Sequence, residues 1–396
     1  MTTESTSQLS PTDAPIDGQN IRIERANLDD LKALVALENQ AFEGDKLTKR
    51  RLKHWITAQN AIFIVAKHQQ DILGYALTIL HKGSALARLY SLAVSPLARG
   101  LGIAAKLIQK CEKSAFKQGR LYLRLEVAEN NQAAISLYRK LGFEEFGFYQ
   151  DYYHDHQAAL RMQKRLYFAH DTIVEQDNSQ QSIAVPWYQQ TTPFTCGPAA
   201  AMMAMATLDN NYTPNQNDEL HLWREATTIF MTSGHGGCHP VGLALALQKR
   251  QFNVKVFLNQ SDTLFLDGVR SDEKRTIIEL VEKDFKQRAV EQQIAVEYYG
   301  YQLQDLETWF NQGAMIILLI STYQLDGTKA PHWVCVSGID NECVYIHDPD
   351  PTDEDDNQLN CQYMPIARDV FSRMNRYGKN KLSCAIVVER ESSLKR

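Results

Sequence analysis

The sequence lacks several features that define whole classes of protein. Apolar runs are short: residues 314–320 form a run of seven, against the ~20 apolar residues that a membrane-spanning helix needs. Basic residues are not in excess, since 42 Lys and Arg face 47 Asp and Glu. The net charge of −5 therefore gives no general field that would attract nucleic acid or anionic lipid. Residues 1–20 contain acidic side chains and no apolar core, so we expect a polar, disordered lead and no signal peptide.

The seven cysteines are few and scattered, and no two of them form a CxxC pair. A disulfide framework needs dense, regular cysteine spacing, so the simplest expectation is a reduced, cytoplasmic protein with free thiols. Hydrophobic residues (44%) and charged residues (22%) occur in the proportions of a folded globular protein. At ~150 residues per domain, the 396 residues predict two to three domains.

Residues 21–168 alternate between segments typical of strands and segments typical of helices. Two apolar segments, 61–67 and 72–82, are separated by a polar turn and predict a β-hairpin. An amphipathic helix is expected over 101–117, and a later helix is expected to end at Gly142, a residue typical of the position after a helix. This alternation predicts an α/β domain in which helices cover a mixed sheet.

A polar stretch at 169–184 is expected to be a linker, and a second domain is expected over 185–396. Its first part predicts helices at 197–208 and in much of 218–292, interrupted by a strand at 252–258. Apolar, β-branched segments near the C-terminus predict several strands. Helices first and strands later predict an α+β domain.

A glycine-containing turn at 99–104 joins a predicted strand to a predicted helix. The start of a helix offers unpaired N–H groups and a partial positive charge, and Gly100 and Gly102 let the backbone approach an anion closely. Arg99 adds a cationic donor, so the turn predicts a phosphate site. A dinucleotide-binding fold would also need an acidic residue ~20 positions on. Glu126 lies 26 residues after Gly100, so this class fits poorly.

Two motifs in this order resemble the GNAT acetyltransferase superfamily over residues 21–168. They are V-x-P-x-x-R-G-x-G-x-A, which begins at Val94, and LEVAENNQAAISLYRKLGF, which begins at Leu125. The resemblance implies acetyl-CoA as the acetyl donor, with its pyrophosphate held by the backbone amides of 100–104. The residues that it implies for cofactor binding are Leu92, Val94, Arg99, Gly100, Leu101, Gly102, Ile103, Ala104 and Asn131.

Within the superfamily, the second motif looks most like the ribosomal-protein-alanine N-acetyltransferases. That likeness implies Glu126 as general base and Tyr138 as general acid. The chemistry agrees, because acetyl transfer needs an uncharged amine, and an α-amine (pKa ~8) loses its proton more easily than a lysine (pKa ~10.4). Taken alone, the two residues would be a solvated strand carboxylate and a core tyrosine. The motif order favours the catalytic interpretation, with the N-terminal α-amine of a peptide or protein as acceptor.

A second candidate centre begins at Cys196, directly before a predicted helix. A thiolate at a helix N-terminus is stabilised by the helix dipole, as a nucleophile requires. Gln190, six residues earlier, could donate an amide N–H to an oxyanion beside the backbone N–H of Cys196, and Gln189 is the alternative.

A nucleophilic thiol also needs a base, and His332 opens a predicted strand. Asp348 ends the next strand, so antiparallel pairing of the two strands could place it beside the imidazole and orient it. Asp350 is the alternative to Asp348, which directly follows the strand. His347 is interpreted as an ordinary histidine at a strand end.

The pattern Gln-x5-Cys-Gly-Pro, then His-Trp, then Asp-Pro resembles the papain-like peptidases that cleave double-glycine leaders from bacteriocins, over about 185–390. The resemblance implies Cys196 as nucleophile, His332 as base, Asp348 as orienting residue and Gln190 in the oxyanion hole. Those processors are normally attached to a membrane exporter, and neither membrane spans nor an ATPase is found here. The helical insert at 209–292 is also longer than a minimal peptidase needs, so leader-peptide specificity is not expected to carry over.

The loop GHGGCHP at 234–240 could in principle bind a metal, but no second ligand pair with zinc spacing exists, so no metal is expected. The sequence thus predicts a cytoplasmic enzyme with an N-terminal acetyltransferase and a C-terminal thiol hydrolase that act on one peptide or protein system. No nucleic-acid or membrane partner is expected. The alternative hypothesis is that one domain is a catalytically silent module that presents peptide to the other.

Overall fold

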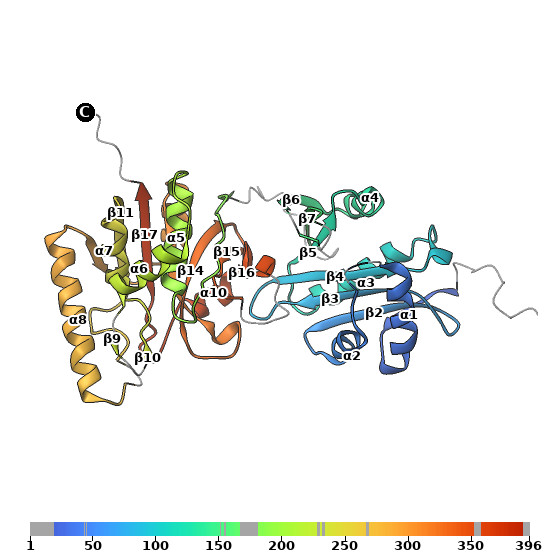
Figure 1. The fold of residues 1–396 in the computed structure, drawn as a ribbon, viewed down its shortest axis with the longest axis horizontal. Coiled ribbons are helices and arrows are strands. Elements are labelled where there is room, and N and C mark those ends of the chain that lie inside the picture. Colours follow the sequence, from blue (N-terminus) through green and yellow to red (C-terminus); the bar gives the residue numbers. More distant parts are fainter. Residues whose placement is uncertain are drawn as a thin grey trace, which may run out of the picture. The chain divides into compact units, whose positions relative to one another are not determined.

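A computed structural model describes residues 20–42, 44, 46–150, 152–153, 156–166, 181–227, 230–231, 234–266, 269–351 and 358–390. The expected lead (apart from Asn20), residues 169–180 of the expected linker and residues 352–357 lie outside the described residues. The chain divides into two compact units, whose described parts lie mainly within 20–166 and 181–390. Each unit is described by itself (Figure 1).

The first unit is built on a seven-stranded sheet with the order β1-β2-β3-β4-β5-β7-β6. Its neighbouring strands pair antiparallel, except that β4 and β5 run parallel. The strands are β1 (Arg22–Arg25), β2 (Ala61–His68), β3 (Asp71–Leu80), β4 (Leu86–Val94), β5 (Tyr122–Ala128), β6 (Glu144–Tyr149) and β7 (Ala159–Arg165). The helices are α1 (Leu31–Ala41), α2 (Lys49–Thr57), α3 (Ile103–Phe116) and α4 (Gln132–Lys140).

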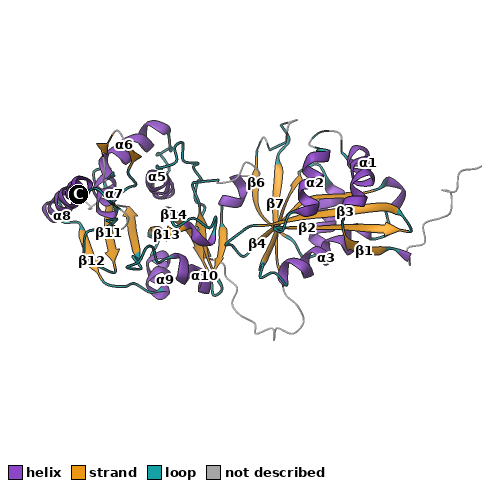
Figure 2. Ribbon diagram, turned by 90° about the horizontal axis from the view of Figure 1, so that it is seen from below, coloured by secondary structure: helices purple, strands orange, loops and turns teal. Residues whose placement is uncertain are grey.

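Helices cover both faces of this sheet, with α1 and α2 on one side and α3 on the other (Figure 2). On β2, Phe63 and Val65 pack into the core under α1 and α2. Ile62 and Ile64 alternate with them and pack into the core under α3 and α4. Because successive side chains of a strand point to opposite faces, two covered faces explain why β2 is apolar at consecutive positions.

The sheet opens between β4 and β5, whose residues are all described. Their ladder covers only residues 86–88 of β4, and it ends where Arg88 pairs with Arg124. Beyond that point β4 pairs with β3 alone, and its register with β3 shifts at Tyr90, a β-bulge. Bulges bend a strand and increase its twist, which accounts for the separation of β4 from β5.

The second unit contains an eight-stranded sheet with the order β12-β11-β17-β13-β14-β15-β16, and β8 pairs with β14. Only β11 and β12 run parallel to each other. The strands are β8 (Gln181–Ser182), β11 (Phe252–Leu258), β12 (Ala295–Tyr298), β13 (Met315–Ser321), β14 (Pro331–Ile339), β15 (Cys343–His347), β16 (Met364–Ala367) and β17 (Cys384–Arg390). Its helices are α5 (Cys196–Leu208), α6 (Gln216–Ala226), α7 (Pro240–Gln248), α8 (Asp272–Glu291), α9 (Leu303–Asn311) and α10 (Arg368–Met374).

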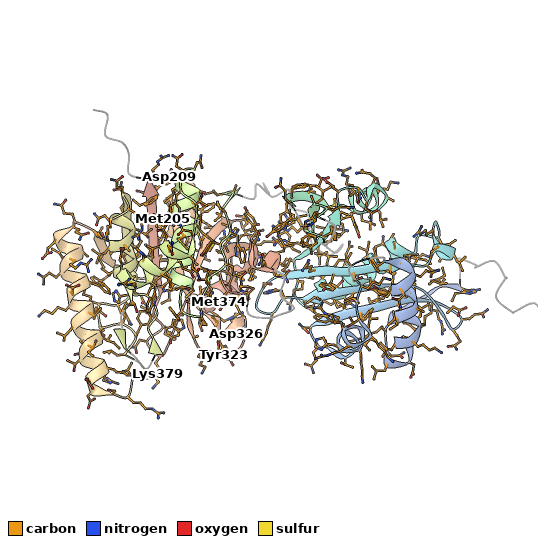
Figure 3. The ribbon with its side chains drawn as sticks, in the orientation of Figure 1. Met205, Asp209, Tyr323, Asp326, Met374 and Lys379 are labelled. Atoms are coloured by element: carbon orange, nitrogen blue, oxygen red, sulfur yellow. The ribbon has the colours of Figure 1, made fainter. Side chains whose placement is uncertain are left out.

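Two cores hold the second unit together. Side chains of α5 to α8 pack with Ile317 and Leu319 on one face of the sheet, whereas α9 and α10 pack with Ile316 and Leu318 on the other. Figure 2 shows α5 and α9 on opposite sides of the strands. In Figure 3, Met205 lies near the end of α5, where its side chain is 1% exposed. Helix α5 is thus buried on nearly all sides, which explains its continuous run of alanine and methionine.

The fold class is confirmed: both units mix helices and sheet, the first resembling the expected α/β arrangement and the second an α+β one. Several elements were missed, namely α2, α9, α10, β12 and β16. Each is short, and β16 contains a proline, so the periodic signal is weak. Strand β8 falls inside the expected linker and pairs with β14. Among the described residues, no helix is both long and apolar enough to cross a membrane.

Candidate active sites

The glycine turn of the first unit forms an open cradle at the start of α3. Gly100 and Gly102 have φ angles of +84° and +72°, which side chains other than glycine rarely adopt. A Cβ added at either position would meet no described atom within 4 Å. Gly102 is the N-cap of α3, and no side chain caps the helix. The start of α3 thus lacks a side-chain cap and the space beside both glycines is open, as the binding of a phosphate requires.

The other residues implied for cofactor binding lie around this cradle with different exposures. Arg99 is exposed beside the glycines, whereas Ile103 is buried in the core, so only its backbone can face a ligand. Leu92 and Val94, on the separated part of β4, are half-buried against the core under α3. Asn131 caps α4, because its side-chain oxygen accepts a hydrogen bond from the N–H of Ala134 (3.1 Å). Its observed role is thus structural.

Glu126 lies on β5 at the point where the sheet opens, and its side chain is 5% exposed. Oε2 accepts hydrogen bonds from Nε of Arg88 (2.7 Å) and forms an ion pair with Nη2 of the same residue (2.7 Å). Oε1 lies 4.0 Å from Nε of Arg161. Oε1 is therefore the oxygen that remains for an amine or a water molecule. Sequence reasoning missed Arg88, although a basic residue in a buried strand is an unusual feature that needs a partner.

Tyr138 projects from α4, is buried, and packs edge-on against Phe143. Burial raises the pKa of Tyr138 to about 12, so this tyrosine keeps its proton at neutral pH. Tyr153 lies near both Tyr138 and Glu126. Burial raises the pKa of Tyr153, and Tyr152, Glu126 and Tyr138 raise this pKa further. The two predicted catalytic residues therefore lie within electrostatic reach of one side chain.

Tyr152 completes this cluster, because its hydroxyl accepts a hydrogen bond from Nη2 of Arg88 (2.8 Å). Arg88 thus contacts both Glu126 and Tyr152, and its Nη2 takes part in both contacts. Neither Tyr152 nor Tyr153 was predicted as a site residue, although adjacent tyrosines in a polar loop between two strands are an available signal.

In the second unit, the three residues of the predicted triad meet. Cys196 opens α5, His332 lies on β14, and Asp348 follows β15, which pairs antiparallel with β14. Nε2 of His332 lies 2.7 Å from Oδ1 of Asp348. Burial alone would lower the pKa of His332, but Asp348 and Cys196, each also a hydrogen-bond partner, raise it well above its ordinary value. Since Nε2 faces the aspartate, Nδ1 is left for the thiol.

The segment before Cys196 is attached to the segment after Asp348. The N–H of Gln190 donates to the carbonyl of Pro349 (2.9 Å), and Nε1 of Trp187 donates to the carbonyl of Asp348 (2.7 Å). Oε1 of Gln190 is buried and accepts no hydrogen bond from any described residue. Oε1 can only accept a hydrogen bond, so it is the acceptor of this side chain that stays unpaired among the described residues.

The alternatives left open by the sequence are arranged differently. Gln189 accepts a hydrogen bond from Gln358 at the surface (2.9 Å). Asp350 donates its N–H to Oδ1 of Asp348 (2.9 Å), so it supports that aspartate, and the histidine pairs with Asp348. His347 is buried and packs edge-on against Tyr363.

All seven cysteines are free thiols, and Cys196 is the one that is not buried. Cys238 is its neighbour: burial raises the pKa of Cys238 well above the ordinary value, and Cys196 raises it further. Among the described residues, no group of three or more His, Cys, Asp or Glu could hold a metal ion.

Comparison with known proteins assigns each unit to a family. Residues 28–143 match the acetyltransferase (GNAT) family, and residues 185–389, just over half of the chain, match the Peptidase_C39 like family. An uncharacterised N-acetyltransferase of Methanocaldococcus jannaschii is 31% identical over 137 residues, which are 34% of this chain and 86% of that protein. The chain belongs to both families.

The GNAT unit has further relatives. An N-alpha-acetyltransferase of Sulfurisphaera tokodaii is 29% identical over 162 residues, which are 37% of this chain and 93% of that protein. The crystal structure of the ribosomal-protein-S18-alanine N-acetyltransferase from Escherichia coli matches with a TM-score of 0.35 and 24% identity, covering 39% of this chain and 98% of that one. Membership of the GNAT family supports acetyltransferase activity for the first unit, and the C39-like match covers the segment that holds Cys196, His332 and Asp348.

Proposed function

We propose that the GNAT unit transfers the acetyl group of acetyl-CoA to the N-terminal α-amine of a peptide or protein. The observation that carries this proposal is the opening between β4 and β5. The glycine cradle lies beyond the open end of β4, and Glu126 lies on β5 two residues past Arg124, the last residue paired with β4. The name of the Sulfurisphaera relative, an N-alpha-acetyltransferase, supports the α-amine as acceptor.

The residues present fit acetyl-CoA. The backbone of 100–104 and Arg99 would hold the pyrophosphate, because the positions of the missing Cβ atoms are open and no side chain caps α3. Leu92 and Val94 would line the path along β4. The group supplies an activated acetyl thioester, and the protein must supply a free amine and stabilise the departing sulfur.

Glu126 would take the proton of the amine at Oε1, directly or through a water molecule, since Oε2 is held by Arg88. Tyr138 would then stabilise the developing thiolate with its O–H. A tyrosine whose pKa is about 12 holds its proton more tightly than a free thiol, whose pKa is ~8.5. We therefore expect Tyr138 to act mainly as a hydrogen-bond donor that completes proton transfer only as the sulfur departs.

The experiment is incubation of the full-length protein with acetyl-CoA and a library of peptides that differ in their first residues, followed by mass spectrometry. Acetylation at the peptide N-terminus supports the proposal. Acetylation confined to lysine side chains would contradict the choice of acceptor but leave the acetyltransferase assignment in place.

We further propose that the C39-like unit is a thiol hydrolase with a Cys-His-Asp triad. The contact of His332 with both Asp348 and Cys196 supports this proposal. The thiolate of Cys196 would attack an amide or ester carbonyl, and His332 would protonate the leaving group as its bond to the carbonyl carbon breaks. Water would then release the acyl group from the sulfur.

The same peptide incubation reports cleavage, so one experiment examines both units. Fusion in one chain suggests that a cleavage exposes an N-terminus which the GNAT unit then acetylates. Acetylation without cleavage, together with a Cys196 that does not react selectively with thiol reagents, would favour the alternative in which the second unit only presents peptide.

A further inference from the structure

A buried glutamate on α6 organises the segment that leads to Cys196. Glu219 is 0% exposed, and its carboxylate accepts four hydrogen bonds from three residues. Oε1 accepts from the N–H of Thr191 (2.8 Å) and from the hydroxyl of Thr195. Oε2 accepts from the hydroxyls of Tyr188 (2.9 Å) and Thr191 (2.8 Å).

The burial of this carboxylate is costly, and its surroundings do not neutralise it. Among the described residues, no Lys, Arg or His lies within ion-pair distance of Glu219. Burying a carboxyl group costs free energy that its hydrogen bonds offset only in part. The four hydrogen bonds restrict the chain to an arrangement that presents all of their donors to Glu219.

The donors show which arrangement is specified. Tyr188 and Thr191 lie on either side of Gln190, and Thr195 directly precedes Cys196. Residues 188–195 form neither helix nor strand, so they have no ladder to fix them. Glu219 therefore holds both ends of the segment that contributes the side-chain amide of Gln190 and the backbone N–H of Cys196.

The contact with Thr195 has a second effect at the start of α5. Thr195 is the N-cap of this helix, where a threonine hydroxyl ordinarily accepts a hydrogen bond from the first turn. Here it makes no such cap: its single proton is directed to Glu219, and its oxygen lies 2.9 Å from the hydroxyl of Thr192, which can donate to it. The first N–H groups of α5, beside Cys196, thus stay uncapped by a side chain.

We propose that Glu219 is the positioning residue of the oxyanion hole: it fixes Gln190 and keeps the N-terminus of α5 available to a developing oxyanion. This inference rests on the proposed thiol hydrolase function. It predicts that removing the carboxylate impairs reactions in which Cys196 attacks a carbonyl, and spares reactions of the same thiolate that develop no oxyanion.

The test compares two reactions of full-length protein. With p-nitrophenyl acetate, a C–S bond forms at the carbonyl, an oxyanion develops, and the C–O bond breaks to release p-nitrophenolate. With iodoacetamide, the C–S bond forms as the C–I bond breaks, and no oxyanion develops. The ratio of the acylation rate constant to the alkylation rate constant at Cys196 therefore measures the oxyanion hole separately from the supply of thiolate.

We expect Glu219→Ala to lower acylation at least tenfold and to change alkylation less than about threefold. The expected loss is smaller than the ~100- to 1,000-fold that removal of an oxyanion donor itself causes, because Glu219 acts through Gln190. Gln190→Ala should lower the ratio in the same way, and the double variant should lose little more, because both changes act on one site. Glu219→Gln should recover part of the ratio, since its carbonyl oxygen can still accept from the N–H of Thr191.

Two further variants make the test independent of folding defects. Thr195→Val keeps the side-chain shape and removes one donor, so it should lower the ratio about threefold even if Glu219→Ala fails to fold. Glu225→Gln is the matched control on the same helix, because Glu225 pairs with Lys249 and Arg250 (2.8 and 2.7 Å), and it should leave the ratio unchanged.

The outcomes separate this inference from the function on which it rests. A wild-type protein whose Cys196 is neither acylated nor selectively alkylated overturns the thiol hydrolase and, with it, the role of Glu219. A reactive wild type in which Glu219→Ala and Thr195→Val leave the ratio unchanged overturns the role of Glu219 alone.

Discussion

The two units treat their reactive groups in opposite ways. The GNAT unit opens its sheet between β4 and β5 and places Glu126 at the junction, neutralised by Arg88. The C39-like unit keeps its sheet continuous from β13 to β15 and sets Cys196 on a helix beside it, in contact with His332.

The difference follows from the chemistry proposed for each. Direct transfer between two substrates needs space within the fold for both, and the protein contributes only proton transfer and orientation. A covalent hydrolase supplies the nucleophile itself, so it needs an aligned triad more than an internal opening. We therefore expect that removing a charge from the first unit lowers its activity but leaves cofactor binding intact. In the second unit, we expect the reactivity of Cys196 to depend on individual contacts, such as that with His332.

The largest effect is expected for the thiol of Cys196. It should react with iodoacetamide on the order of a hundredfold faster than the six buried cysteines near neutral pH. Burial alone would protect those six, so the decisive comparison is His332→Ala, which should slow labelling of Cys196 about tenfold by removing its cationic partner. Mass spectrometry of labelled peptides measures both, and acetyl transfer by the same variant should be unchanged. An unaltered labelling rate in His332→Ala would show that the imidazole does not activate the thiol.

The next effect concerns acid–base chemistry in the GNAT unit. Tyr138→Phe keeps the packing against Phe143 and should lower kcat at least tenfold, since general acid–base groups contribute ~100- to 10,000-fold. Glu126→Gln should lower kcat similarly and also reduce stability, because buried Arg88 loses its counter-charge. Steady-state kinetics and calorimetry of acetyl-CoA binding separate the two effects, and binding should be retained. Wild-type rates in both variants would remove these residues from the reaction.

A smaller effect is expected at the cradle. Gly102→Ala should raise the Kd for acetyl-CoA about tenfold, because the added methyl group occupies the space of the anion. Gly119→Ala is the matched control: Gly119 has nearly the same φ (+75°) and equally open surroundings, but follows the other end of α3. Both variants should lose about 1 kcal/mol of stability from backbone strain. Equal affinities in calorimetry would place the pyrophosphate elsewhere.

The smallest effect is a pH dependence of stability in the second unit. Because the folded-state pKa of His332 is raised, its proton stabilises the fold fully below the unfolded value of ~6.5, and this contribution is lost as pH rises through the folded-state pKa. Asp348→Asn removes the main group that raises this pKa. The stability difference between wild type and variant should therefore shrink by on the order of 1 kcal/mol as pH rises above 6.5.

Urea unfolding followed by tryptophan fluorescence suits this measurement, because four of the five tryptophans (187, 223, 309 and 333) lie in the second unit. The difference should be largest near pH 6. Parallel stability curves from pH 6 to 9 would mean that Asp348 does not hold the proton on His332.

In the second unit, motif order and helix-start chemistry pointed to residues that lie close together in the structure, Cys196, His332 and Asp348. The missed residues act through partners that are distant in sequence. Arg88 and Glu126 are 38 residues apart and meet only because β4 and β5 pair side by side. Such pairing is not visible in local periodicity.

Glu219 was missed for a different reason, because local periodicity did contain a signal. It shares the buried face of α6 with Leu222 and Ala226, at positions where the helical pattern calls for apolar side chains. A glutamate on such a face must find donors or cations. The sequence could have indicated that requirement, but only the fold shows that residues 188–195 meet it.

Strand β4 also fixes a length. Arg88, its last residue paired with β5, holds Glu126, and six residues later the strand ends at Val94, just before the turn that forms the cradle. At ~3.3 Å per residue, about 20 Å separate the two ends of this open stretch. In the proposed reaction, the acetyl donor must therefore extend along this stretch from the cradle to Glu126. A short acetyl thioester would reach only one of the two ends, so the length of the molecule that carries the acetyl group contributes to the choice of donor.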